Sequence, residues 1–455
     1  MKYLWIINIK RVLTRIALLK LLSSSCGVVQ SFSILPHHHT NNRIQQRPFC
    51  RIPRATTNNN NMQQTTGSTT TTTLLQSTTQ LSWQSLTPLL ETQDPSTLCV
   101  ATTEDQQPRL AKDETYATAV LHAWRKDVSS FHGDAKDLAT VGSAFVYETI
   151  LRSNNEDENT TDSTTVVMNS YLVAPSSLVA KERNNNNKEK QQERQRLPAI
   201  LLFHTGAGPQ DIFLRWKADV LVRELNCVVL IVDIIGDADG YAWSDNRERY
   251  NAARDNILSV TSESSDQTAA TTTVLARWNL RRAIGAAIHH IKEDLDFVNG
   301  DKLAGMGWCM GGHPILELGQ MMNGISGVRA LISYHGVFDG VVVCDEDDDA
   351  AAASDDTSRD NPTPTTTAAA TTTTQVLICN GVDDPFVQQK HVENAKQLLE
   401  RKGGCHVRVL NFDKVKHGFS NPAQDFNPSD AFAFNEDAAT KSWDAAIQLL
   451  KETLL

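Results

Sequence analysis

From Leu197 onward the sequence alternates between continuous apolar runs and segments in which apolar residues recur at helical spacing. Residues 197–204 and 227–235 are such runs, and residues 211–225 between them show the helical spacing. A short continuous apolar run is typical of a strand buried on both faces, so this alternation predicts a mainly parallel sheet with helices on both faces. Ligands of such sheets bind beyond the carboxyl ends of the strands, and a functional site is expected in the loops there.

The alternation extends through the rest of the chain and predicts one α/β domain over residues 115–455. A further helix is expected to begin near Gly312. The other predicted strands are 302–308, 328–335, 375–380 and 406–412, and the other predicted helices are 115–128, 275–295, 387–402 and 438–450.

Polar, low-complexity stretches flank and interrupt this domain. Residues 37–114 are rich in Thr, Asn, Gln and Ser, so they bury too little apolar surface to offset the entropy cost of ordering and are predicted to be disordered. Three further stretches, at 184–196, 262–273 and 345–374, fall between predicted elements. They are interpreted as surface loops, because the entropic cost of loop closure grows only logarithmically with length.

The first 36 residues form a separate segment that is apolar and basic and contains no acidic residue. Its charges interrupt the apolar stretch too often for a membrane span. We expect a targeting presequence that directs import into a mitochondrion or a plastid, with cleavage near Ser31 in the plastid case. A basic helix lying on a membrane surface is the alternative for this segment, and a cytoplasmic location is the alternative for the protein.

Charge and cysteine usage exclude several function classes. The formal net charge of -10 argues against a nucleic-acid partner, because phosphate binding requires clustered cations. The acidic run at 345–349 lacks the glycine and the closing glutamate of a calcium loop, and no cysteine or histidine spacing fits a zinc site. We therefore expect no metal. We also expect no cofactor, and a protein that is a monomer or a dimer.

Cys309 stands at the most informative junction of the sequence. Glycines flank it at 307 and 311, between a predicted strand and a predicted helix. This is the G-x-S-x-G pattern of a nucleophile elbow with cysteine in the place of serine, and the start of the helix favours a thiolate there. A buried cysteine at a tight turn is the alternative interpretation. The backbone N–H of Met310 is the expected oxyanion donor, and Thr205 and Gly206 in the loop after the first core strand are expected to add to it.

Two later loops carry residue types that would complete a catalytic triad. Asp383 and Asp384 follow the predicted strand at 375–380, and His417 follows the strand at 406–412. In a nucleophile-elbow hydrolase the order along the chain is nucleophile, acid, histidine, and this chain has that order. Either aspartate could be the acid, and either could instead belong to an ordinary turn.

These motifs resemble those of the dienelactone hydrolase family. The resemblance rests on Gly-Trp-Cys-Met-Gly-Gly at 307–312, Gly-Val-Asp-Asp-Pro-Phe-Val at 381–387 and His-Gly-Phe-Ser-Asn-Pro at 417–422. It implies an α/β-hydrolase fold with Cys309 as nucleophile, His417 as base and Asp384 as acid, Asp383 being the second choice. Further similarity covers residues 232–237, 277–295 and 332–336, within a region of about 140–453.

Two departures from the family pattern bear on the substrate. The family's glutamate after the first core strand is replaced by the sequence His-Thr-Gly-Ala from His204, and the arginine expected four residues after the catalytic histidine is Asn421. The resemblance therefore implies a small ester or lactone other than dienelactone. His204, Trp308 and Phe386 are candidate pocket residues, although an aromatic residue beside an elbow is more often part of the core.

Three other functions remain open at this stage. A thioesterase would use the same triad, and a class I glutamine amidotransferase also has a glycine-flanked cysteine and a late histidine, although its acid is arranged differently. A catalytically silent fold that binds a ligand or senses redox state through Cys309 is the alternative outside the enzyme class.

Overall fold

The computed structural model describes the greater part of the chain after residue 113, and the described residues belong to one compact unit. The predicted presequence at 1–36, most of 37–114, and most of the loops at 184–196 and 345–374 lie outside the described residues. The described residues are 91–92, 95, 114–132, 139–155, 160–178, 196–236, 254–255, 257–258, 267–321, 325–338 and 373–455.

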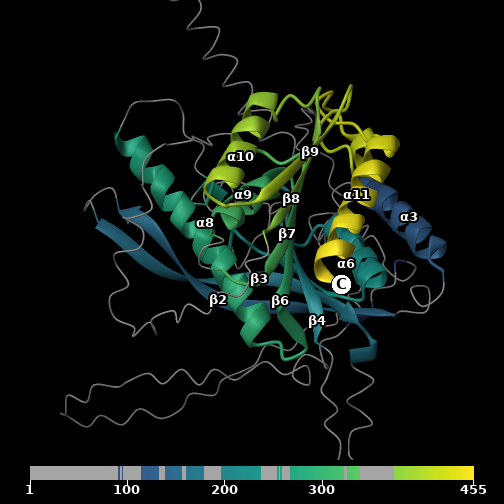
Figure 1. Cartoon of the computed structure of the whole chain (residues 1–455), viewed down its shortest axis with the longest axis horizontal. Coiled ribbons are helices and arrows are strands. Elements are labelled where there is room, and N and C mark those ends of the chain that lie inside the picture. The colour runs from purple at the N-terminus through teal and green to yellow at the C-terminus, as the bar shows by residue number, and fades with distance from the viewer. Residues whose placement is uncertain are drawn as a thin grey trace, which may run out of the picture. The chain divides into compact units, whose positions relative to one another are not determined.

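Nine strands form one sheet in the order β1-β2-β3-β5-β4-β6-β7-β8-β9 (Figure 1). Neighbours from β5 to β9 are parallel, whereas β1, β2 and β3 pair antiparallel, and β3 meets β5 antiparallel. This is the α/β-hydrolase fold that the sequence predicts. The strands are β1 (Glu91–Thr92), β2 (Thr140–Asn155), β3 (Thr160–Pro175), β4 (Leu197–Phe203), β5 (Val228–Val232), β6 (Val298–Trp308), β7 (Val328–Tyr334), β8 (Gln375–Gly381) and β9 (His406–Phe412).

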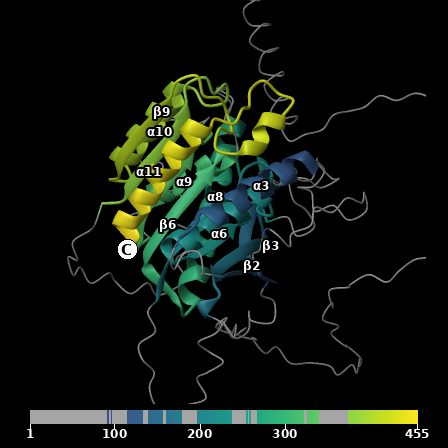
Figure 2. The ribbon, with the colours of Figure 1, turned by 90° about the vertical axis from the view of Figure 1, so that its right-hand side faces the viewer.

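Helices cover both faces of this sheet, as Figures 1 and 2 show. On one face α8 (Gln267–Glu293), α9 (Gly312–Gln320) and α10 (Gln389–Arg401) bury an apolar core, and on the other α3 (Glu114–Ser130), α6 (Ile212–Leu225) and α11 (Glu436–Leu454) bury a second. The central strands β4 and β5 are buried along their whole length, which explains their continuous apolar runs. Of the helices within the described ranges, none is long and apolar enough to cross a bilayer.

Three segments differ from the sequence prediction. The long antiparallel strands β2 and β3 were not predicted, because β2 alternates buried Phe145 and Tyr147 with exposed Val146 instead of forming a continuous apolar run. Helix α8 begins at Gln267 inside the expected loop at 262–273, since each residue added to an existing helix gains a backbone hydrogen bond at little cost. Glu91–Thr92 pairs with β2 although 37–114 was expected to be disordered.

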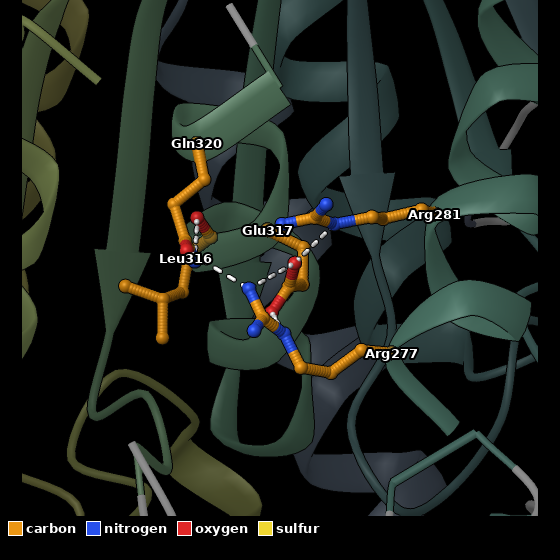
Figure 3. A network of polar contacts seen from close by, with 5 residues as sticks. All are labelled: Arg277, Arg281, Leu316, Glu317 and Gln320. Carbon is orange, nitrogen blue, oxygen red and sulfur yellow. Dashed lines mark hydrogen bonds and ion pairs between the residues drawn. The ribbon is translucent and has the colours of Figure 1, made fainter. Parts of the chain in front are cut away.

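A buried carboxylate joins the two helices that flank β6. Glu317 on α9 points between two arginines of α8, accepting from Arg277 Nε at 2.8 Å and from Arg281 Nε at 2.7 Å (Figure 3). Arg277 also donates to Gln320 Oε1 at 3.0 Å. Because α9 follows Cys309 directly, this network fixes the helix that follows the predicted elbow.

Candidate active site

Cys309 lies at a sharp turn between β6 and α9. Strand β6 ends at Trp308, a short 3-10 helix η3 spans Cys309–Gly311, and α9 begins at Gly312. Cys309 has φ of 54°, a left-handed conformation that costs a non-glycine residue roughly 1–3 kcal/mol. The predicted elbow is therefore present as a strained turn, and its cysteine side chain is only partly buried.

The glycines on each side of Cys309 are required by close backbone contacts. A Cβ atom on Gly307 would overlap the carbonyl oxygen of Gly311. A Cβ atom on Gly311 would lie 2.5 Å from the carbonyl oxygen of Phe203 at the end of β4. Any side chain at either position would force the elbow apart, so only glycine fits at both positions.

His417 and Asp384 lie side by side after β9 and β8. The Nδ1–H of His417 donates to Asp384 Oδ2 at 2.7 Å, and both side chains are almost fully buried. The other carboxylate oxygen of Asp384 accepts from the backbone N–H of Phe386 at 2.9 Å, so the turn itself orients the acid. Asp383 is exposed instead, and the structure therefore brings Asp384 to the histidine.

The other side of His417 faces Cys309. Burial opposes a charged imidazole, but the charges of Asp384 and Cys309, and a hydrogen bond to each, raise the pKa of His417 to about 10. An imidazolium is thus stabilised between a carboxylate and a thiolate. This arrangement can deliver a proton to a leaving group that departs from an acyl carbon bound to the Cys309 sulfur.

Aromatic rings enclose His417, and two of them were not identified from the sequence. His335 and Phe432 pack edge-on against it with centroid distances of 4.6 and 5.2 Å, and Phe386 does so at 5.0 Å. His335 also has Nε2 3.4 Å from Ser420 Oγ. Burial, and then the charge of His417, lower the pKa of His335 well below its usual value, so this second imidazole stays neutral.

His335 follows β7 directly, and Phe432 lies in the loop beyond His417, where it forms an isolated bridge with it. The position of His335 at the carboxyl end of a predicted strand was a usable signal. Phe432 carried none, because only the tertiary contact places it at the site.

The loop after β4 lies beside the elbow, since Phe203 is in register with Gly307. Within this loop the N–H of Ala207 donates to Thr205 Oγ1 at 3.0 Å, so Ala207 is engaged internally. Met310 lies in the first turn after the strand, where N–H groups lack intrahelical acceptors. Met310, Thr205 and Gly206 are thus on segments that meet at the same strand ends.

His204 is fully buried, and its Nδ1 lies 2.8 Å from the carbonyl oxygen of Thr205. Burial lowers the pKa of His204, although the charge of Asp233 and the contact with Thr205 oppose this. A neutral imidazole results. It supplies no negative charge of the kind the family's glutamate offers.

The two remaining pocket candidates lie in different surroundings. Phe386 packs edge-on against His417, whereas Trp308 is completely buried and stacks on Tyr334 with a centroid distance of 5.1 Å. Trp308 is therefore a core residue and not a pocket wall, because its side chain points from β6 toward the face covered by α6 and α11.

Three other cysteines in the described part of the chain are buried and differ from Cys309. Burial raises the pKa of Cys227 and Cys379 strongly and that of Cys405 to about 11, which keeps these thiols protonated and unreactive. Within the same residues, no cluster of three or more His, Cys, Asp or Glu side chains is suited to hold a metal ion.

Comparison with known proteins places this chain in a family. The profile of the Dienelactone hydrolase family matches residues 190–454, which is more than half of the chain. No curated protein matches the sequence.

Several solved structures are similar. One is a dienelactone hydrolase-like promiscuous phosphotriesterase from metagenomic libraries, with 19% identity, 69% of this chain and 99% of that chain covered, and a TM-score of 0.40. A putative dienelactone hydrolase from Klebsiella pneumoniae has 14% identity, coverages of 68% and 99%, and a TM-score of 0.38. An esterase from Pyrobaculum calidifontis has 11% identity, coverages of 77% and 95%, and a TM-score of 0.37. On the family match, this chain is a hydrolase that belongs to the dienelactone hydrolase family.

Proposed function

We propose that the protein hydrolyses a small ester or lactone through a triad of Cys309, His417 and Asp384. The observation that carries this proposal is the position of His417, which donates to Asp384 at 2.7 Å and is hydrogen-bonded to Cys309 on its other side. A nucleophile, a base and an orienting acid linked by hydrogen bonds form the kind of triad that carries out acyl transfer.

In the proposed mechanism the Cys309 thiolate attacks the carbonyl carbon, and the carbonyl electron pair moves onto oxygen. Collapse of this intermediate expels the alkoxide, which takes the proton from the His417 imidazolium and leaves a thioester on Cys309. A water molecule then gives a proton to His417 and attacks the thioester, releasing the carboxylic acid and regenerating the thiolate. Asp384 keeps the imidazole in the tautomer that both steps need.

The oxyanion would be stabilised by the N–H of Met310 and by donors at Thr205 and Gly206. Support comes from the register between Phe203 and Gly307, which sets the loop after β4 next to the elbow. A single preorganised donor of this kind contributes about 3 kcal/mol to transition-state stabilisation.

We infer that the substrate has no carboxylate group that residue 421 would need to bind. Asn421 donates from Nδ2 to Tyr116 Oη at 2.9 Å and accepts from the N–H of Ala423 at 3.0 Å, so both ends of its amide are occupied. A neutral ester or lactone fits these engaged groups better than an anionic dienelactone does.

The test is hydrolysis of an activated short-chain aryl ester by the full-length chain and by its Cys309→Ala and His417→Ala variants. We expect both variants to lose about 10³-fold or more in kcat/KM. Activity that survives in both variants would reject the triad. A panel of esters, lactones and thioesters identifies the preferred acyl donor, and a thioester preference would indicate a thioesterase.

Inactivity of the folded wild-type chain on every member of that panel would favour a binding or redox-sensing role. Oxidation of Cys309 by peroxide, followed by mass spectrometry, distinguishes these two roles.

A further inference from the structure

A cavity of about 930 Å³ lies among α3, α6, the 3-10 helix η6 (Pro422–Phe426) and α11. The residues that line it do not include Cys309, Asp384 or His417. Four aromatic residues, Trp216, Phe426, Phe434 and Trp443, form part of its walls, together with charged, polar and small residues. The volume is within the range of small-molecule sites, and the proposed acyl-transfer chemistry makes no use of it.

Lys217 on α6 lines this cavity and is only 8% exposed. Its Nζ lies 3.5 Å from the ring centroid of Trp216 and 4.6 Å from that of Trp443. Among the described residues, Nζ contacts aromatic rings and makes no hydrogen bond or ion pair with a side chain or a carbonyl oxygen. Nζ is not one of the fully buried polar atoms without a partner, so it reaches the cavity, where water or a ligand can accept from its N–H groups.

The other charged groups around the cavity have partners or reach water. Lys126 and Glu436 form an exposed pair at 3.5 Å, and Asp425 accepts from the N–H of Phe434 at 2.9 Å. Asp127 accepts from Trp216 Nε1 at 3.0 Å, and Asp444 is exposed. Among the described residues that line the cavity, Lys217 therefore differs as the largely buried charge whose direct contacts are with aromatic rings.

We propose that this cavity binds a small monocarboxylate with an aromatic or aliphatic body, its carboxylate on Lys217 and its body between Trp216 and Trp443. A single negative charge satisfies the ammonium. Anions of higher charge are disfavoured, because Asp425, Glu436 and Asp444 line the same cavity. The site is distinct from the proposed triad of Cys309, His417 and Asp384 and does not depend on it.

Protonation of Lys217 gives the site a characteristic pH dependence. Burial lowers the pKa of Lys217 to about 8, opposed by the charge of Asp127. The group is protonated below that pH, so carboxylate binding should be strong at neutral pH and weaken as the pH rises through about 8. The other titratable groups around the cavity are His122, Lys126 and Asp127 on α3, Glu224 on α6, Asp425 on η6, and Glu436 and Asp444 on α11.

The test is calorimetric titration of the full-length Cys309→Ala chain with sodium benzoate and sodium hexanoate, and with benzyl alcohol as a neutral analogue. We expect Lys217→Met to weaken benzoate binding by about tenfold or more, as loss of a hydrogen bond to a charged group does. The rim variant Lys126→Met should change it by less than about twofold. Benzyl alcohol binding should be affected little by either variant.

Benzoate binding that is absent in the folded chain, or unaffected by Lys217→Met, would overturn the proposal. Thermal melting shows whether the Lys217→Met variant folds. If it does not, benzoate is titrated into the Cys309→Ala chain that keeps Lys217, at several pH values from 7 to 9.5. Benzoate affinity that does not fall over that range would then overturn it. Because the titrated chain lacks the Cys309 sulfur, the result is independent of whether the protein hydrolyses esters.

Discussion

At the scale of single residues, the geometry of the acid determines how His417 works. Asp384 uses one oxygen for the backbone N–H groups of Phe386 and Val387, at 2.9 and 3.2 Å, and the other for His417. The carboxylate therefore cannot rotate away without losing all three hydrogen bonds. Asp383, its neighbour in the chain, is exposed and offers a matched comparison.

Asp384→Asn is expected to reduce kcat for aryl-ester hydrolysis by about 10³-fold or more, because the amide no longer holds His417 in the required tautomer. Asp383→Asn should change kcat by less than about twofold, as it does not contact the imidazole. Steady-state kinetics of the two full-length variants checks this. Equal losses in both variants would contradict the assignment of the acid.

The raised pKa of His417 predicts how Cys309 reacts with an alkylating reagent. Since His417 stays protonated up to about pH 10, its charge supports the thiolate from neutral pH upward. Iodoacetamide should alkylate Cys309 several-fold more slowly at pH 7 in His417→Ala than in the wild type, because the positive charge beside the sulfur is lost.

Peptide mass spectrometry locates the labelled cysteine and separates Cys309 from the buried Cys227, Cys379 and Cys405. Equal alkylation rates at pH 7 in the wild type and in His417→Ala would show that the imidazole does not support the thiolate.

At the scale of elements, the elbow depends on the helix that follows it. Glu317 ties α9 to α8 through Arg277 and Arg281, and its side chain is 8% exposed (Figure 3). The arginines are 41% and 24% exposed, so solvent screens part of the interaction. The network contributes more to the free energy of unfolding than an exposed surface pair does, because its acceptor is buried.

Glu317→Gln is expected to lower the free energy of unfolding by about 1–2 kcal/mol, since the amide offers one acceptor where the carboxylate offers two. The exposed pair Lys441–Asp437 provides the control. Removing its cation in Lys441→Met should cost less than about 0.5 kcal/mol. Urea denaturation of the full-length variants measures both changes, and similar effects in the two would contradict the role given to Glu317.

At the scale of the whole molecule, the parallel sheet brings the residues of the candidate site to one edge. Parallel neighbours β6, β7, β8 and β9 end at one edge, and the segments that follow them carry Cys309, His335, Asp384 and His417. These residues are separated by up to about a hundred positions in sequence. Their proximity follows from parallel pairing, which aligns the carboxyl ends of successive strands.

The first 36 residues belong to this scale too, because the sequence predicts that they direct the protein to an organelle. Fused to a fluorescent protein, residues 1–36 should deliver it to a mitochondrion or a plastid, because the segment is basic and apolar and lacks acidic residues. Replacing Lys2, Lys10 and Arg11 by Glu should abolish import. Diffuse cytoplasmic fluorescence from the unmodified fusion would contradict this prediction.

The sequence by itself determined the α/β architecture, because strands buried on both faces must be continuously apolar and helices between them must carry a periodic face. It also located the elbow, since only glycines tolerate the backbone contacts at 307 and 311. It did not reveal β2 and β3, whose one-sided burial produces the weaker alternating pattern.

Only the tertiary structure decided which neighbouring residue reaches the site. It showed that Asp384, which the family resemblance already favours over Asp383, is the aspartate that contacts His417. It also placed Trp308 in the core and brought His335 and Phe432 against His417. The local sequence reports spacing along one segment, whereas side-chain direction depends on strand register and on packing between distant segments. Those contacts exist only after the sheet has assembled.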